Sequence, residues 1–557
     1  MDDFRSGTGP AARPPARRPG GRGDTLLAAL GYAALTAIMT WPHVTVLATH
    51  APDHQDIYFN LWRLRWIAHA LARAPLDLFH GNIFHPEPLT LSFSDAILVE
   101  GAAAAPLFWL GLPPVLVHNL TLWAALVGSG AGMFVLIRHL TGNRGAAFAG
   151  GLIFTFAPYR FDHYMHMELQ WALWIPWAFW ALSRTIADGS RRHGLLTGVF
   201  VALQMLSSIY YGIFLATLLP IAGLVLLAAT GPTRRRAALS ALVPGAIAAA
   251  VASGAYAAPY FLTKDRLGGR GQHEIHTFSA RPSSYLISTP DNIVWGGTFE
   301  GRSRPERRLF PGALALLLAS FGLLLRRPSP MRMACLLGAV AAFELSLGFS
   351  GYSFAILHEH VPVYQGLRAM ARAGLFVLFF VAVLAGYGHA FVASVFPARV
   401  RLVFAAAVVL VLLGEYRVRP LTLVAYPNGP PPLHAWLAEQ PRGVVVELPM
   451  AAPEALPGPD PRYAYLSTFH WQPLLNGYSG FHPRSYLERA ADVRGFPDER
   501  AIARLHADGA RYLVVHLDAW RPDARARIRE TLATRYGLAQ LASFPGREAE
   551  SVVFAVR

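Results

Sequence analysis

The chain has 557 residues, of which 54% are hydrophobic and only 15% are charged, and its formal net charge is +15. Soluble proteins carry about 25% charged residues, so this composition excludes an ordinary soluble protein. Apolar runs of about 20 residues, long enough to cross a hydrocarbon core of about 30 Å, recur along most of the sequence. Basic loops that face anionic lipid account for the positive charge without any nucleic acid. We therefore expect a polytopic α-helical membrane protein.

The N-terminal residues 1–24 are rich in Arg, Pro and Gly, which predicts a disordered cytoplasmic tail. The apolar run over residues 25–49 is too long for a signal-peptide core and has no clear cleavage site, so we expect an uncleaved first span. Cys335 is the only cysteine, which excludes a disulfide framework and a cysteine metal site.

Arginine clusters in short loops mark the cytoplasmic side of a membrane protein. Placing these clusters inside predicts about eleven spans, with the N-terminus inside and the C-terminus outside the cytoplasmic membrane. Together they form a transmembrane domain over residues 25–418. The expected spans are residues 25–49, 114–137, 145–159, 170–186, two within 195–230, 237–260, 309–325, 331–349, 373–395 and 400–418.

One apolar run, over residues 97–112, does not fit this topology. It is short and contains Glu100 and Pro106, and counting it as a span would place most arginine loops outside. We expect a helix that lies at the outer interface, within a large first extracytoplasmic loop over residues 50–113. Polar and aromatic residues gather on the outer face in this layout, so any chemistry is expected there.

The composition changes near residue 419. A proline-rich linker, "YPNGPPP", precedes short β-type runs, "GVVVELPM", "RYLVVHLD" and "ESVVFAVR", with helix-type segments between them. This alternation predicts a small extracytoplasmic α/β domain over residues 419–557.

Several stretches resemble the GT-C superfamily, polytopic glycosyltransferases that use polyprenyl-phosphate sugars. They are "DIYFNLWRLRWIAHAL", "NIFHPEPLTLSFSD", "RHLTG" and "FAPYRFDHYMHMELQWALWIPWAF". Together with "GLRAMARAGLFVLFFVAVLAGYG" and "LLNGYSGFHPRSYL", they are most similar to the bacterial membrane proteins related to the YfhO family. The resemblance implies transfer of a sugar from a polyprenyl-phosphate donor to a glycan, lipid or protein acceptor of the cell envelope, at the outer face of the membrane.

In this superfamily an acidic catalytic residue follows the first span, and the resemblance places Asp56 in that position. Gln55 stands where related sequences usually have Gly. We expect Asp56 to act as the base, with Asp53 as its helper or as a metal ligand. Its position near a low-dielectric interface predicts a raised pKa. The alternative is that both aspartates cap a helix that begins near Ile57.

The stretch "DHYMHME" carries imidazoles and carboxylates at helical spacing. They could bind a divalent metal such as Mg²⁺ or Mn²⁺, line the acceptor pocket, or be hydrogen-bonded surface residues. The sequence leaves these alternatives and the metal requirement open. The residues concerned are Asp162, His163, His166 and Glu168.

Two arginines precede the span over residues 373–395. Arg368 and Arg372 are four apart, so they would share one face of a helix, and guanidinium groups suit phosphate. We expect them to bind the donor phosphate; the alternative is anchoring at the lipid interface. Met370, between them, stands where related sequences often have Pro.

Aromatic residues provide candidate sugar contacts. Trp62 and Trp66 are four apart and could form one aromatic wall near the sugar. Tyr478, in "YSGFHPRSY", could stack on a sugar or belong to the surface where the C-terminal domain docks.

Two other functions stay open. A transporter or lipid flippase needs charged residues inside its spans; Glu344 and Glu415 are the candidates, but both fall near the outer ends of their spans. A non-catalytic scaffold for envelope assembly is the second alternative.

Overall fold

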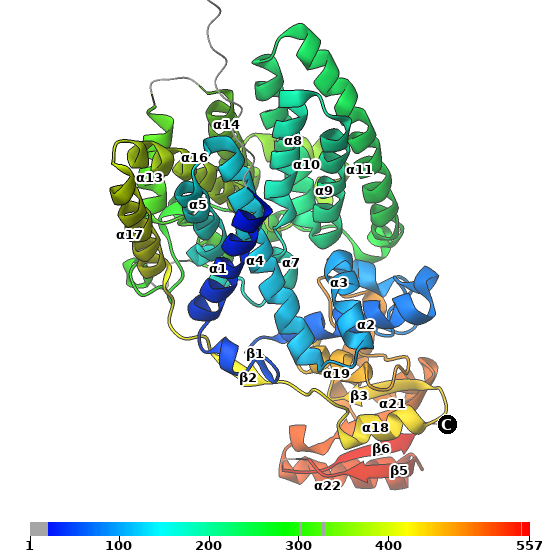
Figure 1. Ribbon diagram of the computed structural model, residues 1–557. Coiled ribbons are helices and arrows are strands. Elements are labelled where there is room, and N and C mark those ends of the chain that lie inside the picture. The colour runs from blue at the N-terminus through cyan, green and yellow to red at the C-terminus, as the bar shows by residue number, and fades with distance from the viewer. Residues whose placement is uncertain (1–20, 300–302, 326–328, 547, 557) are drawn as a thin grey trace, which may run out of the picture.

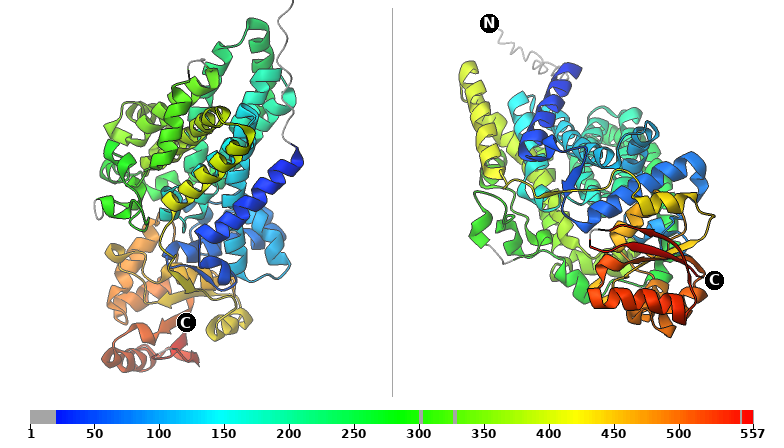
Figure 2. Two further views of the ribbon diagram at one scale, coloured as in Figure 1. Left: turned by 60° about the vertical axis from the view of Figure 1, so that its left-hand side comes forward. Right: turned by 90° about the horizontal axis from the view of Figure 1, so that it is seen from below.

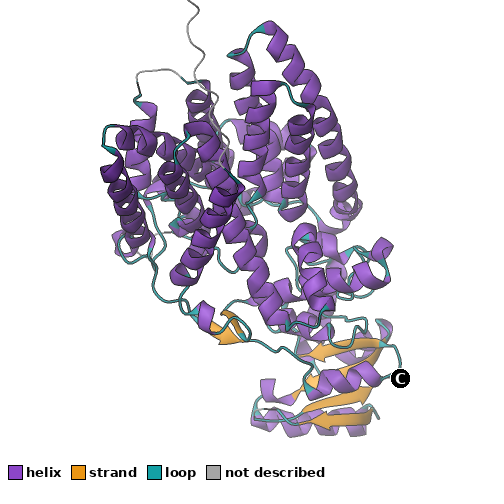
Figure 3. Ribbon diagram, in the orientation of Figure 1, coloured by secondary structure: helices purple, strands orange, loops and turns teal. Residues whose placement is uncertain are grey.

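The computed structural model describes residues 21–299, 303–325, 329–546 and 548–556. Residues 1–20 of the predicted tail lie outside the described residues, and residues 22–24 belong to the first helix. The described chain is mainly helical, and most of its strands gather at the end that holds the C-terminus (Figures 1 and 3).

A helical body occupies the upper part of the molecule in Figure 1. A helix overlaps each predicted span, so the apolar runs were located well although their ends differ. Four short helices lie in the segments between the longer helices of the body: α6 (Pro158–Asp162), α7 (Met167–Gln170), α12 (Gln272–Thr277) and α15 (Ser353–His360). The helices of the body are α1 (Arg22–Met39), α4 (Pro114–Thr141), α5 (Arg144–Phe156), α8 (Trp174–Asp188), α9 (Arg191–Ser207), α10 (Ile209–Ala228), α11 (Pro232–Leu267), α13 (Ala313–Leu323), α14 (Pro330–Ser346), α16 (Gly374–Ser394) and α17 (Ala398–Tyr416).

Four helical segments among the described residues are long and apolar enough to cross a membrane: Pro114–Thr141, Ile209–Ala228, Pro232–Leu267 and Met370–Ser394. They indicate a membrane protein. Other helices of the body are short: α5, with 13 residues, extends only about 20 Å at 1.5 Å per residue. The count of about eleven spans therefore stays a prediction.

The helices α9 and α11 pack closely through glycines. A Cβ atom added to Gly194 would collide with the backbone of Ala241, and one added to Gly198 would collide with the backbone of Gly245. Small residues of this kind allow helix backbones to approach each other in membrane proteins.

We expect Gly198→Val to destabilise the protein by about 1–3 kcal/mol, the usual range for overpacking. The added side chain would meet the α11 backbone, which cannot rotate away as a flexible side chain could. The matched control is Gly254→Ala, because Gly254 lies in α11 and a Cβ atom there has no neighbour within 4 Å. Thermal unfolding in detergent compares the two variants, and a parental Tm for Gly198→Val would contradict this packing.

The first loop lies between the helical body and the C-terminal sheet, and it contains α2 (Gln55–Arg73) and α3 (Leu98–Trp109). The predicted interfacial helix is α3, which packs on α2. A Cβ atom added to Gly101 of α3 would collide with Ile67 of α2. With 12 residues, α3 spans only about 18 Å, too short to cross the membrane.

The C-terminal segment forms a four-stranded sheet in the order β3-β4-β6-β5. β3 (Val444–Leu448) and β4 (Ala510–His516) are parallel, and the other neighbours are antiparallel. The three β-type runs predicted from sequence form β3, β4 and β6 (Ser551–Ala555). β5 (Ala539–Phe544) was not predicted, because its sequence, "AQLASF", contains no β-branched residue. The helices around the sheet are α18 (Pro432–Glu439), α19 (Asp460–Ser467), α20 (Arg484–Asp492), α21 (Glu499–Ala507) and α22 (Pro522–Glu530).

The C-terminal segment and the first loop share one hydrophobic core. Trp62 and Phe84 of the loop belong to the same buried cluster as Tyr463 and Leu474. β1 (His50–Pro52) pairs antiparallel with β2 (Leu423–Ala425), which fastens the start of the loop to the linker. Figure 2 shows the two parts from two further sides. The change of composition near residue 419 therefore does not mark a break in packing.

Candidate active site

A cavity of about 870 Å³ lies where the first loop, α10, α11 and the C-terminal segment meet. Apolar side chains from α10 and α11, both long enough to cross a membrane, form part of its wall. The cavity also brings together residues that are far apart in the sequence. The predicted site residues that line it are Asp56, His166, Glu168, Arg368, Arg372 and Tyr478.

The Asp56 carboxylate has two close partners. The Tyr478 hydroxyl donates to Asp56 Oδ1 at 2.6 Å, and His166 Nδ1 lies 2.8 Å from Asp56 Oδ2. The capping atom of α2 is instead His54 Nδ1, which accepts the Asp56 backbone N–H at 3.1 Å. The capping alternative is therefore wrong for Asp56, whose side chain lines the cavity.

These partners determine the charge of the pair. Burial disfavours the Asp56 carboxylate, but the hydrogen bond and charge of His166 and the hydrogen bond from Tyr478 outweigh it and lower the pKa of Asp56. Burial also disfavours the imidazolium, but the Asp56 carboxylate raises the pKa of His166. The prediction of a raised pKa for Asp56 is wrong, because the carboxylate faces a basic partner.

Tyr478 reaches Asp56 from a loop that is fixed at several points. The Leu475 N–H donates to the Val445 carbonyl of β3 at 2.9 Å, and the Phe84 N–H of the first loop donates to the Asn476 carbonyl at 2.9 Å. Asn476 Nδ2 donates to the carbonyl of Glu447 at 2.9 Å. This anchoring joins Tyr478 to Asp56 across 422 positions of sequence.

Two further residues of the cavity were not predicted. Arg63 is only 2% exposed. Its Nη2 atom lies 3.1 Å from Glu168 Oε2, and its Nη1 atom donates to the backbone carbonyl of Asp95 at 2.6 Å. Asp95 Oδ1 accepts the Ile209 N–H at 2.7 Å, and burial, with Glu168 nearby, raises the pKa of Asp95 to about 7. The available signal for Arg63 was that it is one of two arginines in the mainly apolar stretch "DIYFNLWRLRW".

Arg372 is 8% exposed, and its guanidinium carbon lies 4.6 Å from the ring centroid of Tyr210. Its Nε atom is buried without a hydrogen-bond partner, and no ion pair of its side chain is present among the described residues. Arg368 differs, because its Nη1 donates to Glu274 Oε1 at 2.9 Å.

The two arginines were predicted to share a helix face, and this is wrong. Arg368 precedes a short 3₁₀ turn, Met370–Ala373, in which Arg372 lies. Both side chains nevertheless line the same cavity.

Three predicted residues lie outside this cavity. Asp53 is exposed. Asp162 pairs with Arg308 at 2.9 Å, and burial raises its pKa to about 6. His163 is buried, 4.5 Å from the ring of Tyr159. The helical spacing expected over residues 162–168 is wrong, because α6 ends at Asp162 and α7 begins at Met167.

The two predicted tryptophans do not line this cavity either. Trp62 is 0% exposed and stacks between Phe59 and Trp66, with ring centroids 5.8 and 6.4 Å away. It is a core residue of the first loop. Trp66 lines a separate cleft, described below.

The residues of this cavity do not fit a divalent metal as they are arranged. Among the described residues, no group of three or more His, Cys, Asp or Glu side chains is placed to hold one ion. Both oxygens of Asp56 already have partners, and Glu168 pairs with Arg63. We derive no step through a metal, and the Mg²⁺ or Mn²⁺ requirement stays a prediction.

The two glutamates considered for transport accept hydrogen bonds from backbone N–H groups at the N-termini of neighbouring helices. Glu415 accepts the Leu314 N–H of α13 at 3.2 Å and the Trp295 indole N–H at 3.0 Å. Glu344 accepts the Ser353 N–H of α15 at 2.8 Å. Carboxylates near helix N-termini stabilise the helix, so the contacts of both glutamates support a structural role.

No protein-family model matches the chain, and no curated protein matches it. Two solved structures from Archaeoglobus fulgidus are similar. The crystal structure of an oligosaccharyltransferase in the apo form has 14% identity and a TM-score of 0.50, covering 89% of this chain and 69% of that chain. The archaeal oligosaccharyltransferase AglB, in complex with an inhibitory peptide and a dolichol-phosphate, has 13% identity and a TM-score of 0.48, with coverage of 89% and 69%.

The likeness to the apo structure concerns the fold. It shows that this chain shares the fold of that structure over 89% of its length. The four long apolar helices independently indicate a membrane protein.

Proposed function

We propose that the protein is a membrane glycosyltransferase that transfers a sugar from a polyprenyl-phosphate donor to a cell-envelope acceptor. One observation supports this most: a single cavity combines the Asp56–His166 pair, the buried unpaired Arg372 and an apolar wall from two candidate membrane helices. Transfer from a lipid phosphate needs a group that receives the acceptor proton, a cation for the leaving phosphate and a groove for the lipid tail.

The donor phosphate is proposed to bind Arg372, with Arg368 beside it. Arg372 makes no ion pair among the described residues, although Glu306 and Glu168 of the same cavity interact with it electrostatically; a phosphate in contact with the guanidinium would add charge-assisted hydrogen bonds. Arg270 also lines the cavity, with its guanidinium carbon 3.3 Å from the ring centroid of Phe481. The polyprenyl tail would follow the apolar side chains of α10 and α11.

The acceptor is proposed to bind beside Asp56. Its hydroxyl or amide attacks the anomeric carbon, the bond from that carbon to the phosphate oxygen breaks, and the phosphate leaves with the electron pair. The acceptor proton passes to the Asp56 carboxylate. His166 and Tyr478 orient this carboxylate, while Arg372 stabilises the charge that develops on the phosphate.

Purified full-length protein tested with a panel of polyprenyl-phosphate sugars would test this function. We expect one donor class to bind and to release polyprenyl phosphate in the presence of acceptor. Movement of the lipid across the proteoliposome membrane without sugar transfer would support the flippase alternative. No interaction with any donor would support the scaffold alternative.

The relation to the YfhO group stays a prediction. Activity after EDTA treatment, with and without added Mg²⁺ or Mn²⁺, tests the metal requirement.

The predicted topology places this cavity at the outer face of the cytoplasmic membrane. A reporter that is active only in the cytoplasm should therefore be silent when fused after Arg557. The same reporter inserted between α8 and α9, in an arginine-rich loop, should be active and serves as the control. Strong signal from the C-terminal fusion would reverse the proposed orientation or change the number of spans by an odd number.

A further inference from the structure

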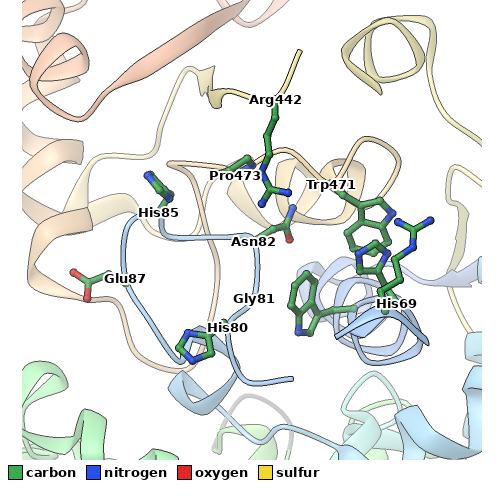
Figure 4. A pocket seen from close by; sticks show the side chains of 11 residues that line it. His69, His80, Gly81, Asn82, His85, Glu87, Arg442, Trp471 and Pro473 are labelled. Carbon is green, nitrogen blue, oxygen red and sulfur yellow. The ribbon is translucent and has the colours of Figure 1, made fainter. Parts of the chain in front are cut away.

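A second cavity, of about 410 Å³, opens between the first loop and the C-terminal segment (Figure 4). None of its lining residues lines the larger cavity. His69 lies near the end of α2 opposite to Asp56, about 20 Å away along the axis at 1.5 Å per residue. The volume falls within the range of about 300–1,000 Å³ that is typical of small-molecule sites. The structure therefore contains a second possible ligand site, separate from the transfer cavity.

One wall of this second cavity is aromatic. The ring centroid of Trp471 lies 3.9 Å from that of His69 and 5.9 Å from that of Trp66, and Figure 4 shows Trp471 beside His69. The Trp66 indole N–H already donates to the Leu78 carbonyl at 2.8 Å. Trp62 and His69 stack on the Trp66 ring, with centroids 6.4 and 5.8 Å away. The part of the ring that lines the cavity is apolar surface, against which the C–H groups of a sugar pack.

The backbone of this wall is held in an unusual conformation. Trp471 has φ 55°, in the left-handed region that bulky residues rarely adopt. Its N–H donates to the Ser467 carbonyl at 2.7 Å, which fixes the turn. Such strain persists only where the surrounding structure enforces it, and it concentrates at ligand sites.

The cavity also carries positive charge. Arg73 and Arg442 are exposed, and no ion pair or hydrogen bond of either guanidinium is present among the described residues. Glu87 is the acidic residue of the lining, but it already accepts the Ser485 hydroxyl at 2.6 Å and lies 3.7 Å from Arg266. Among the described residues, Arg73 and Arg442 are therefore the two lining cations that have no anionic partner.

Histidines complete the lining. Burial, together with the charges of Arg73 and Arg65, lowers the pKa of His69 to about 4, and burial lowers the pKa of His85. A neutral imidazole can both donate and accept hydrogen bonds, which suits sugar hydroxyls. Asn82, by contrast, is already bonded to Trp62 and to residues of the C-terminal segment.

We infer that this cavity binds an anionic saccharide segment, one that carries a carboxylate or a phosphate. Arg73 and Arg442 hold the anionic group, and Trp66 and Trp471 pack against the sugar ring. The inference does not depend on sugar transfer in the larger cavity.

Isothermal titration of the full-length protein in detergent tests this inference with three probes. Trigalacturonic acid carries carboxylates, glucose 6-phosphate carries a phosphate, and maltotriose is the neutral comparison. We expect at least one charged probe to bind about tenfold or more tightly than maltotriose. The neutral sugar lacks the anionic group that would accept hydrogen bonds from the arginines, and one such bond corresponds to about this factor in affinity. The stronger charged probe identifies the anionic group.

Variants then locate the binding. The substitutions Arg442→Gln and Trp471→Ala should each lower the affinity for the charged probe about tenfold or more. The matched control is Arg527→Gln, an exposed arginine of α22 outside the cavity. Because Arg442 is exposed, its variant keeps the test decisive if Trp471→Ala does not fold. Arg372→Gln, which alters the proposed phosphate site of the larger cavity, should bind the probe normally, and this separates the second cavity from the transfer cavity.

Three results would overturn the inference. They are absence of binding for both charged probes, equal affinity for maltotriose, and parental affinity in Arg442→Gln.

Discussion

The substitution Asp56→Asn should lower the rate of sugar transfer by about 10²–10⁴-fold, the range for loss of a general base. Asparagine keeps the shape and can still accept the hydrogen bond from the Tyr478 hydroxyl, which lies 2.6 Å from Asp56 Oδ1. It cannot receive the acceptor proton, and it leaves His166 without its anionic partner. Binding of the donor should stay near the parental value, since the proposed phosphate site lies at the arginines.

Asp53→Asn is the matched control, because it makes the same chemical change three residues earlier on an exposed side chain outside the cavity. It should transfer sugar at the parental rate unless a metal binds there. Rates measured with radiolabelled donor compare the two variants. Parental transfer by Asp56→Asn would remove Asp56 from the chemistry and favour the scaffold alternative.

The same pair predicts a pH signature in stability. The lowered pKa of Asp56 contributes stability above its unfolded pKa, and this is lost as the pH falls through the folded pKa. The raised pKa of His166 contributes stability below its unfolded pKa, and this is lost as the pH rises through the folded pKa. Both contributions are present between about pH 4 and 6.5, the unfolded values. The Tm difference between the parent and Asp56→Asn should therefore be largest in this window.

Arg372→Gln should weaken donor binding by about 1.5–3 kcal/mol, or roughly 10- to 100-fold, as expected for a hydrogen bond to a charged group. Arg372 is buried in the cavity with no anionic partner among the described residues, so a phosphate would supply one. Arg368→Gln is the internal comparison. Its effect should be smaller, because Arg368 already pairs with Glu274 at 2.9 Å.

The stability of the Arg372 variant separates a binding role from a structural one. Glu306 and Glu168 interact electrostatically with the buried Arg372 guanidinium, so the Tm of the ligand-free Arg372→Gln protein should fall only slightly, while its donor affinity should fall about tenfold or more. Measuring both the binding of a fluorescent polyprenyl-phosphate sugar and the Tm distinguishes a binding role of Arg372 from a structural role. Parental donor affinity with a lower Tm would show that Arg372 supports packing and does not bind phosphate.

Sequence position was a good guide to single residues of the cavity and a poor guide to their partners. Asp56 was identified by its place after the first apolar run, and Tyr478 by the aromatic content of its loop. Nothing in either stretch connects them, because their contact depends on how the C-terminal segment packs against the first loop. The predicted pKa of Asp56 was wrong for the same reason, since it depends on His166, which another segment supplies.

Helical spacing misled where the chain breaks. Arg368 and Arg372 were placed on one helix face, and residues 162–168 were treated as continuous, but both stretches contain turns. Trp62 and Trp66 do stack, as their spacing predicts, with ring centroids 6.4 Å apart. The side of α2 on which they are buried depends on the C-terminal segment, and it directs Trp66 into the second cavity.

The sequence alone predicted the features that depend on the local composition of the chain. Apolar length placed the helices of the body, β-branched runs placed three of the strands, and sparse charge identified a membrane protein. The tertiary structure alone decided which charges are paired, which arginine is left without an anion, and which aromatic rings face a cavity. The reason is physical: burial and ion pairing are set by contacts between segments that lie hundreds of residues apart, and no local pattern of residues encodes those contacts.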